Sequence, residues 1–300
     1  MKLLITDSWK SFELYKHCFS NHEITFLSDS ESHVSNPEQF DIVICNNLFK
    51  YNDIKKFTNL KLIQTTSTGL DKMPLDYLHE KNIDLMNVGN AYSIPIAEYV
   101  LSVILYQYKN INFFEENKKS FTWCKCRGLT ELYQKNVLIF GCGNIGCEIA
   151  KRLNSFNAKC FGIDICKRKS KYFKSIKKPC DAKYIIPKAD IIISCLPLTD
   201  KTKHYFSEDV FAIFKTKTLF INVSRGAVVC EEDLVSHLGK NIDYAILDVF
   251  ENEPLPKNSV LWQLKNVFIS PHNSFEGEHN NLRVGKIITR NVCNWIKQQR

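Results

Sequence analysis

Three glycines follow a short apolar run near the middle of the chain. Gly141, Gly143 and Gly146 stand in GxGxxG register directly after the strand-like run 137–140, and a helical pattern follows them. In such a turn the first glycine allows a tight bend, the second lets the backbone approach a pyrophosphate, and the third lets helix and strand pack closely. Asp164 comes 18 residues after Gly146, near the spacing of an acid that accepts hydrogen bonds from ribose hydroxyls. The order of strand, turn, helix, strand and acid predicts a dinucleotide site.

Ionisable side chains also follow later apolar runs of strand length. Arg225 follows the run 218–223 and offers a planar cation suited to bidentate capture of a carboxylate, although a structural ion pair is the alternative. His272 follows the run 267–269 and suits an acid near neutral pH, whereas the alternative is a hydrogen-bonded core histidine. Glu253 by itself is typical of a loop carboxylate. Ligands of an open α/β sheet bind beyond the carboxyl ends of its strands, so these positions favour a site there.

Two sets of apolar runs predict two parallel sheets. Both sets alternate with polar or helical stretches, including helical patterns at 206–214 and 231–238. The first set lies at 3–6, 24–27, 42–45, 62–64 and 83–86, and the second lies at 137–140, 190–195, 218–223, 243–247 and 267–269, with a further run that ends at Asp164. Such alternation is typical of α/β proteins. We therefore expect two doubly wound parallel-sheet domains, and the domain with the glycine turn should be of the Rossmann type.

Helix signals set the boundaries between the predicted domains. Ser93, with Pro95 in the following turn, marks a helix start, and the apolar run 96–105 continues it. The stretch 278–297 has the pattern of one amphipathic helix, which we expect to pack back on the first domain. The prediction is one domain formed by residues 1–88 plus 274–300, with a dinucleotide-binding domain at 89–273 inserted in it.

The overall composition argues against several classes of protein. With 44% hydrophobic and 24% charged residues over 300 positions, the chain is typical of a folded globular protein rather than a disordered one. No apolar run approaches the length of a bilayer span, and the first seven residues turn polar too early for a signal peptide, so we expect a cytoplasmic protein with no membrane partner. The net charge of +8 is dispersed except at 167–171 and 174–178. These clusters are typical of solvated surface, so we expect no nucleic-acid partner.

The twelve cysteines are scattered along the chain rather than arranged as a disulfide framework. Cys45, Cys195 and Cys230 lie in or beside apolar runs, where a thiol behaves as a small hydrophobic group. Cys124 and Cys126 form a single C-x-C with no second pair at the spacing of a zinc site. We expect reduced thiols and no metal.

Taken together, these groups resemble the D-isomer-specific 2-hydroxyacid dehydrogenase family. The resemblance covers nearly the whole chain and implies a Rossmann-type cofactor domain inserted in a smaller, flavodoxin-like substrate domain. It rests on the glycine turn and on the motifs KLIQ at 61–64, GLD at 69–71, AYS at 91–93, AE at 97–98, LPLT at 196–199, NVSRG at 222–226, LDVF at 247–250, EPLP at 253–256 and SPHN at 270–273.

The resemblance implies an oxidoreductase that interconverts a small 2-keto acid and a D-2-hydroxy acid with NAD. Arg225 would bind the substrate carboxylate and polarise the keto oxygen, His272 would protonate that oxygen, and Glu253 would hydrogen-bond His272. Asp248 stands where the family contacts the nicotinamide carboxamide. The implied cofactor contacts are Gly141, Gly143, Asn144, Ile145, Gly146, Asp164, Leu196, Pro197, Thr202, Val223, Ser224, Asp248 and His272. The implied substrate contacts are Thr68, Gly69, Leu70, Tyr92 and Arg225.

The choice of cofactor and substrate is only partly predicted. Asp164 favours NAD over NADP, because a carboxylate accepts from the ribose 2′-hydroxyl and repels a 2′-phosphate, although Lys167 and Arg168 lie near enough to soften that repulsion. The loop 65–72 has no arginine for a substrate phosphate, which favours an unphosphorylated 2-keto acid. Pyruvate, glyoxylate, hydroxypyruvate and branched 2-keto acids all remain open. Tyr92 either lies near the substrate or packs at the hinge.

Other aspects of function are open to alternatives. Some relatives of this family bind NAD and act as transcriptional corepressors, and the absence of long disordered flanks argues against that role here. The short stretch after His272 leads us to expect no regulatory domain of the kind that some phosphoglycerate dehydrogenases carry. We expect a homodimer, because family members commonly pair through their cofactor domains. The apolar segment 94–108 and the aromatic-rich segment 113–123 would supply the interface, and packing within one chain is the alternative.

Overall fold

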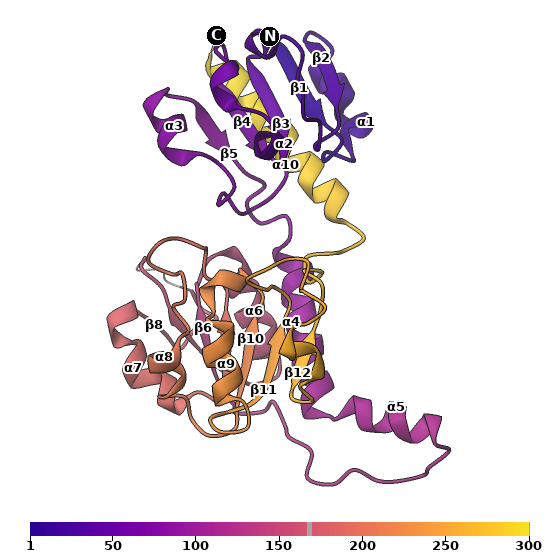
Figure 1. Cartoon of the computed structure of the whole chain (residues 1–300), viewed down its shortest axis with the longest axis vertical. Coiled ribbons are helices and arrows are strands. Elements are labelled where there is room, and N and C mark those ends of the chain that lie inside the picture. Colours follow the sequence, from indigo (N-terminus) through magenta and orange to yellow (C-terminus); the bar gives the residue numbers. More distant parts are fainter. Residues whose placement is uncertain (167–169, 300) are drawn as a thin grey trace. The chain divides into compact units, whose positions relative to one another are not determined.

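The computed structural model describes residues 1–166 and 170–299, and the chain divides into two compact units. Unit 1 comprises Met1–Tyr92 and Gly277–Arg300, and unit 2 comprises Ser93–Glu276 (Figure 1). Unit 2 is therefore an insertion in unit 1. The two boundaries lie four and three residues beyond the expected positions 88/89 and 273/274.

Unit 1 is built on a parallel sheet. Within the described residues the sheet has five strands in the order β2-β1-β3-β4-β5, which is the flavodoxin-like order. The strands are β1 (Lys2–Thr6), β2 (Glu23–Leu27), β3 (Ile42–Cys45), β4 (Leu62–Thr65) and β5 (Asp84–Met86). The α-helices are α1 (Phe12–Tyr15), α2 (Leu48–Tyr51), α3 (Leu75–Glu80) and α10 (Asn280–Gln298).

Helix α10 completes the core of unit 1. Every residue of β3 and β4 is buried, as expected for parallel strands covered on both faces. One stripe of α10 joins the apolar cluster on this sheet, and it includes Val284, Ile288, Val292, Trp295 and Ile296. The indole N–H of Trp295 also donates to Asp84 Oδ2 at 2.6 Å. The expectation that the C-terminal helix packs on the first domain is confirmed.

Unit 2 is built on a second parallel sheet. Its seven strands among the described residues have the order β12-β11-β10-β9-β6-β7-β8, which reverses between β6 and β9 as in a Rossmann fold. The strands are β6 (Asn136–Phe140), β7 (Lys159–Ile163), β8 (Ser175–Lys177), β9 (Ile191–Ser194), β10 (Thr218–Asn222), β11 (Ile242–Leu247) and β12 (Val267–Ile269). The α-helices are α4 (Ser93–Tyr108), α5 (Ile111–Lys119), α6 (Asn144–Ser155), α7 (Ala182–Ile185), α8 (Glu208–Phe211) and α9 (Glu231–His237). The predicted fold class, with two doubly wound parallel sheets, is confirmed.

Two elements of unit 2 differ from the sequence prediction. The helical pattern at 206–214 forms only α8, because Phe206 is extended and pairs with Val229 in an isolated bridge. The basic stretch 174–178 contains edge strand β8 and is not only solvated surface. No helix in the described parts of the chain has the length and apolar character needed to cross a membrane.

Candidate active site

The glycine turn between β6 and α6 leaves open space beside one backbone position. A Cβ on Gly141, whose φ is +89°, would lie 2.5 Å from the carbonyl oxygen of Cys195, and a Cβ on Gly146 would lie 2.1 Å from the carbonyl oxygen of Gly141. Both glycines are therefore required by packing within the protein. A Cβ on Gly143 would meet no protein atom within 4 Å. The absence of a side chain there suits a ligand that approaches the backbone, as a dinucleotide pyrophosphate does.

Helix α6 begins directly at this turn. Its first three residues are the predicted cofactor contacts Asn144, Ile145 and Gly146, and Gly143 is its N-cap. The amide groups of a helix's first turn have no partner within the helix, and together with the helix dipole they favour an anion. The residues present thus fit the phosphates of a dinucleotide.

Asp164 follows β7 and is held by backbone donors. Its Oδ2 accepts from the N–H of Cys142 at 2.8 Å, and its Oδ1 accepts from the N–H of Cys166 at 2.8 Å. The carboxylate is therefore fixed beside the glycine turn, and each oxygen retains a lone pair for a ribose hydroxyl. Lys167 and Arg168, predicted to soften its repulsion of a 2′-phosphate, lie outside the described residues.

The loop after β9 carries three further predicted cofactor contacts. Thr202 folds this loop on itself, because its hydroxyl donates to the carbonyl oxygen of Pro197 at 2.6 Å and accepts from the N–H of Thr199 at 2.8 Å. Leu196 packs at the edge of the apolar core of unit 2. These contacts keep the loop at the carboxyl edge of the sheet.

The turn after β10 presents Arg225. The buried Asn222 at the end of β10 accepts from the N–H and the hydroxyl of Ser224, and its side chain donates to the carbonyl oxygen of Arg225 at 3.1 Å. The guanidinium of Arg225 donates through Nη1 to the carbonyl oxygen of Ser224 at 2.8 Å. Gly226 is needed next, since a Cβ there would lie 1.8 Å from the backbone carbon of Phe250. Val223, a predicted cofactor contact, lies in the same turn.

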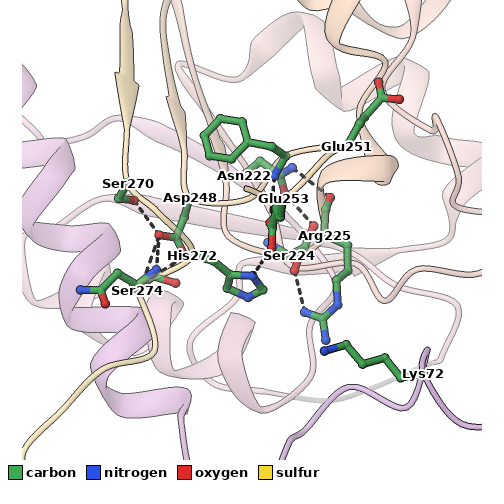
Figure 2. A network of polar contacts seen from close by, with 12 residues as sticks. Lys72, Asn222, Ser224, Arg225, Asp248, Glu251, Glu253, Ser270, His272 and Ser274 are labelled. Carbon is green, nitrogen blue, oxygen red and sulfur yellow. Dashed lines mark hydrogen bonds and ion pairs between the residues drawn. The ribbon is translucent and has the colours of Figure 1, made fainter. Parts of the chain in front are cut away.

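His272 and Glu253 form a direct pair in unit 2. Figure 2 shows this pair together with Arg225. The ring Nδ1 of His272 lies 2.9 Å from Glu253 Oε2, and Glu253 Oε1 accepts from the N–H of Phe250 at 3.1 Å. Burial by itself would raise the pKa of Glu253. The hydrogen bonds from His272 and Phe250, with the positive charges of His272 and Arg225, outweigh burial and hold that pKa below its usual value. Glu253 is thus an ionised partner that orients the imidazole, as expected of a histidine that moves a proton.

Asp248 anchors the turn that carries His272. Its carboxylate is fully buried and accepts from the hydroxyl of Ser270 and from the N–H groups of Asn273 and Ser274 (Figure 2). Its carbonyl oxygen accepts from the N–H of His272 at 2.7 Å. His272 has a φ of +50°, a left-handed conformation that persists only where surrounding contacts determine it. Sequence reasoning did not identify this role, although Asp248 and Ser270 both stand in motifs that it singled out.

The predicted substrate contacts of unit 1 form a group of their own. The hydroxyl of Thr68 donates to the carbonyl oxygen of Gly89 at 3.3 Å, and the hydroxyl of Ser67 donates to that of Gly69 at 3.1 Å. Tyr92 donates its phenolic proton to the carbonyl oxygen of Thr66 at 2.8 Å. Tyr92 therefore lies against the loop that also contains Gly69 and Leu70.

The cysteines take no part in this geometry as cross-links or ligands. All twelve lie within the described residues, and none forms a disulfide. Burial raises the pKa of the Cys160 thiol to about 12 and raises that of Cys195 still further. Across residues 1–166 and 170–299, no group of three or more His, Cys, Asp or Glu side chains is arranged to hold a metal ion.

Comparison with known sequences points to one family. A model of the NAD-binding domain of D-isomer specific 2-hydroxyacid dehydrogenases matches residues 101–274, which is more than half of the chain. The chain is 30% identical to D-3-phosphoglycerate dehydrogenase of Methanocaldococcus jannaschii over 243 residues, which cover 80% of this chain and 46% of that protein. It is 31% identical to glyoxylate/hydroxypyruvate reductase B of Klebsiella pneumoniae over 229 residues, which cover 73% of this chain and 70% of the reductase. The chain thus spans less than half the length of the first relative and more than two thirds of the second.

A solved structure agrees with this assignment. The crystal structure of a D-isomer specific 2-hydroxyacid dehydrogenase family protein from Aeromonas salmonicida has a TM-score of 0.87 and 28% identity, and covers 100% of this chain and 96% of that one. The two parallel-sheet units of the chain agree with that similarity in fold. The chain belongs to the D-isomer specific 2-hydroxyacid dehydrogenase family.

Proposed function

We propose that this protein interconverts small, unphosphorylated 2-keto acids and D-2-hydroxy acids with NAD(H) as cofactor. One observation carries the proposal: His272 and an ionised Glu253 form a 2.9 Å pair at the carboxyl edge of the cofactor sheet, in a site that also contains Arg225. A carboxylate-binding cation beside an oriented proton donor is the pairing that reduction of a 2-keto acid requires. When bound, the nicotinamide cofactor would supply or accept the hydride.

The residues of the site have distinct roles in this proposal. Arg225 binds the substrate carboxylate with its planar guanidinium and draws electron density from the adjacent keto oxygen. His272 donates a proton from its ring to that oxygen during reduction and takes it back during oxidation. Glu253 keeps the ring oriented and stabilises its positive charge. Thr68, Gly69, Leu70 and Tyr92 are the substrate contacts that we propose in unit 1.

Cofactor binding is assigned to the glycine turn and the loops beside it. The first turn of α6 would hold the pyrophosphate, and Asp164 would accept from the ribose hydroxyls, which favours NAD over NADP. Leu196, Pro197, Thr202, Val223, Ser224 and Asp248 are the remaining contacts that we propose. The Asp248 carboxylate is fully buried, so its contact with the carboxamide would require the cofactor to reach a side chain that is shielded from solvent.

A cofactor-oxidation assay tests the proposal. Absorbance of NADH and NADPH would be followed in parallel with pyruvate, glyoxylate, hydroxypyruvate, phenylpyruvate and 2-ketoisocaproate. We expect rapid NADH oxidation with one of these acids, and a fall in turnover of about 100-fold to 10,000-fold in His272→Ala with the fold intact by circular dichroism. Turnover of that variant close to wild type would refute the role of His272. NADH binding without oxidation by any acid would leave two alternatives: a substrate outside this panel or a cofactor-sensing protein.

A further inference from the structure

Tyr99, in the second turn of α4, reaches the turn that carries His272. Its phenolic oxygen lies 2.5 Å from the hydroxyl oxygen of Ser270, the residue directly after β12. The Ser270 hydroxyl lies 2.6 Å from Asp248 Oδ1. A continuous chain of hydrogen bonds therefore runs from a helix on the flank of unit 2 to the buried anchor of the histidine turn.

The direction of the protons in this chain follows from the chemistry of its members. An ionised carboxylate only accepts, so the single proton of Ser270 must go to Asp248. The bond between Tyr99 and Ser270 must then use the proton of Tyr99. Burial, with the negative charge of Asp248, raises the pKa of Tyr99 to about 12, so the phenol keeps its proton at neutral pH. Tyr99 thus holds the Ser270 hydroxyl in the one orientation in which it donates to Asp248.

The Asp248 carboxylate is buried and is stabilised only by neutral hydrogen-bond donors in the described residues. It is fully buried, and no lysine, arginine or histidine within the described residues forms an ion pair with it. Its charge is stabilised by Ser270 and by the N–H groups of Asn273 and Ser274, at 2.8 Å and 3.1 Å from Oδ1. A buried anion depends strongly on each such donor, and these same donors fix the backbone on both sides of His272.

We propose that Tyr99 is a positioning residue for catalysis, which acts through Ser270 and Asp248 to hold the His272 turn in its active conformation. This inference rests on the proposed dehydrogenase function, in which His272 moves the proton. The Tyr99 hydroxyl is hydrogen-bonded to Ser270, so its influence on His272 is indirect. Its effect should therefore fall on turnover and on the rigidity of the turn, not on the affinity for the cofactor.

The test compares Tyr99→Phe, Ser270→Ala and the double variant with wild type. Tyr106→Phe is the matched control: Tyr106 lies on the same helix and packs on Phe268 of β12, and its hydroxyl has no hydrogen-bond partner in the described parts of the chain. Steady-state kinetics would give kcat and KM for each variant. Hydrogen exchange, followed by NMR, would report the N–H groups of Asn273 and Ser274 without any need for turnover.

We expect Tyr99→Phe to lower kcat about five- to tenfold with the KM for NADH within about twofold of wild type, and to speed exchange of both amides by a similar factor. The double variant should match Ser270→Ala alone, because Tyr99 acts only through Ser270. Tyr106→Phe should resemble wild type.

Unchanged exchange in Tyr99→Phe, or losses that multiply in the double variant, would overturn the inference. If wild type turns over no 2-keto acid, the proposed function fails, and the exchange data still decide whether Tyr99 holds the turn.

Discussion

Single side chains in this protein have properties set by a few close neighbours. Glu253 is only partly exposed, and burial disfavours its charge, yet its short contact with His272 keeps it ionised. The same imidazole is oriented by that carboxylate. The two side chains therefore hold each other in position.

The low pKa of Glu253 leads to a pH-dependent contribution to stability. A carboxyl whose pKa is lower in the folded state stabilises the fold above its unfolded pKa, about 4.3 for glutamate, and loses that effect as pH falls through the folded value. We expect wild type to melt at a higher temperature than Glu253→Gln at pH 6, and the gap to close below about pH 4. Thermal melts from pH 3 to pH 7 would measure it. A gap that widens on acidification would contradict the assigned shift.

The guanidinium of Arg225 should not be replaceable by an ammonium. Arg225→Lys keeps the charge but loses the planar pair of donors, so we expect kcat/KM for the keto acid to fall about 100-fold or more. The KM for NADH, measured in the same kinetics, serves as the internal control and should change little. Kinetics equal to wild type for both substrates would exclude bidentate capture.

Residues at strand ends could be predicted from sequence because each follows an apolar run directly. Arg225 and His272 are examples, and the structure finds both at the carboxyl edge of one sheet. Tyr99 could not be found in this way. It is 171 positions from Ser270 and lies in a helix whose pattern indicates only packing, so no local signal marks its partner.

At the level of elements, the turn between β6 and α6 shows two different reasons for glycine. Gly146 is required by the backbone of the turn itself, whereas the space beside Gly143 is empty of protein. Gly146 is thus required for the fold, whereas Gly143 leaves space for the ligand. The two reasons can be separated by experiment.

Alanine at position 143 should weaken cofactor binding, whereas alanine at position 146 should lower stability. Gly143→Ala should melt close to wild type and lose about tenfold or more in affinity for NADH, since its φ of −73° suits alanine and its Cβ would meet only the ligand. Gly146→Ala should lower the free energy of unfolding by about 1–3 kcal/mol, because its Cβ would overlap the carbonyl of Gly141. Calorimetric melts and NADH titrations would test both. Full NADH affinity in Gly143→Ala would argue against a pyrophosphate at this turn.

Elements with continuous apolar runs were predictable, and elements without them were not. Strands β3, β4, β9 and β10 are buried at every position, which their sequences indicate. Edge strand β8 has a single apolar residue, Ile176, and so carries no strand signal. Gln134, in the turn before β6, has a φ of +60°, a conformation that favours glycine and that its sequence does not reveal.

At the scale of the whole molecule, unit 2 presents an unusual exposed segment. Helix α5 and the stretch after it project away from the sheet of unit 2 (Figure 1), and Phe121 and Trp123 are 98% and 99% exposed. Two large apolar side chains left wholly in water favour a covered state in an assembly. The predicted homodimer would cover them.

Light scattering tests this prediction. We expect wild type to have the mass of a dimer, and Phe121→Ser with Trp123→Ser to shift it toward the monomer, because the pair would lose the apolar area buried between copies. Trp262→Ser is the control. Trp262 lies outside this segment and is 53% exposed, and the variant should remain dimeric. A monomeric wild type at micromolar concentration would be evidence against the homodimer.

The insertion of unit 2 within unit 1 has a consequence for biosynthesis. Unit 2 is continuous from Ser93 to Glu276, so it can fold as soon as that stretch has left the ribosome. Unit 1 cannot, because the apolar stripe of α10 that closes its core is translated only after unit 2. The part of the sheet face that α10 covers therefore stays exposed until the whole insertion has been synthesised. Chaperones that shield nascent chains should therefore act mainly on the amino-terminal segment.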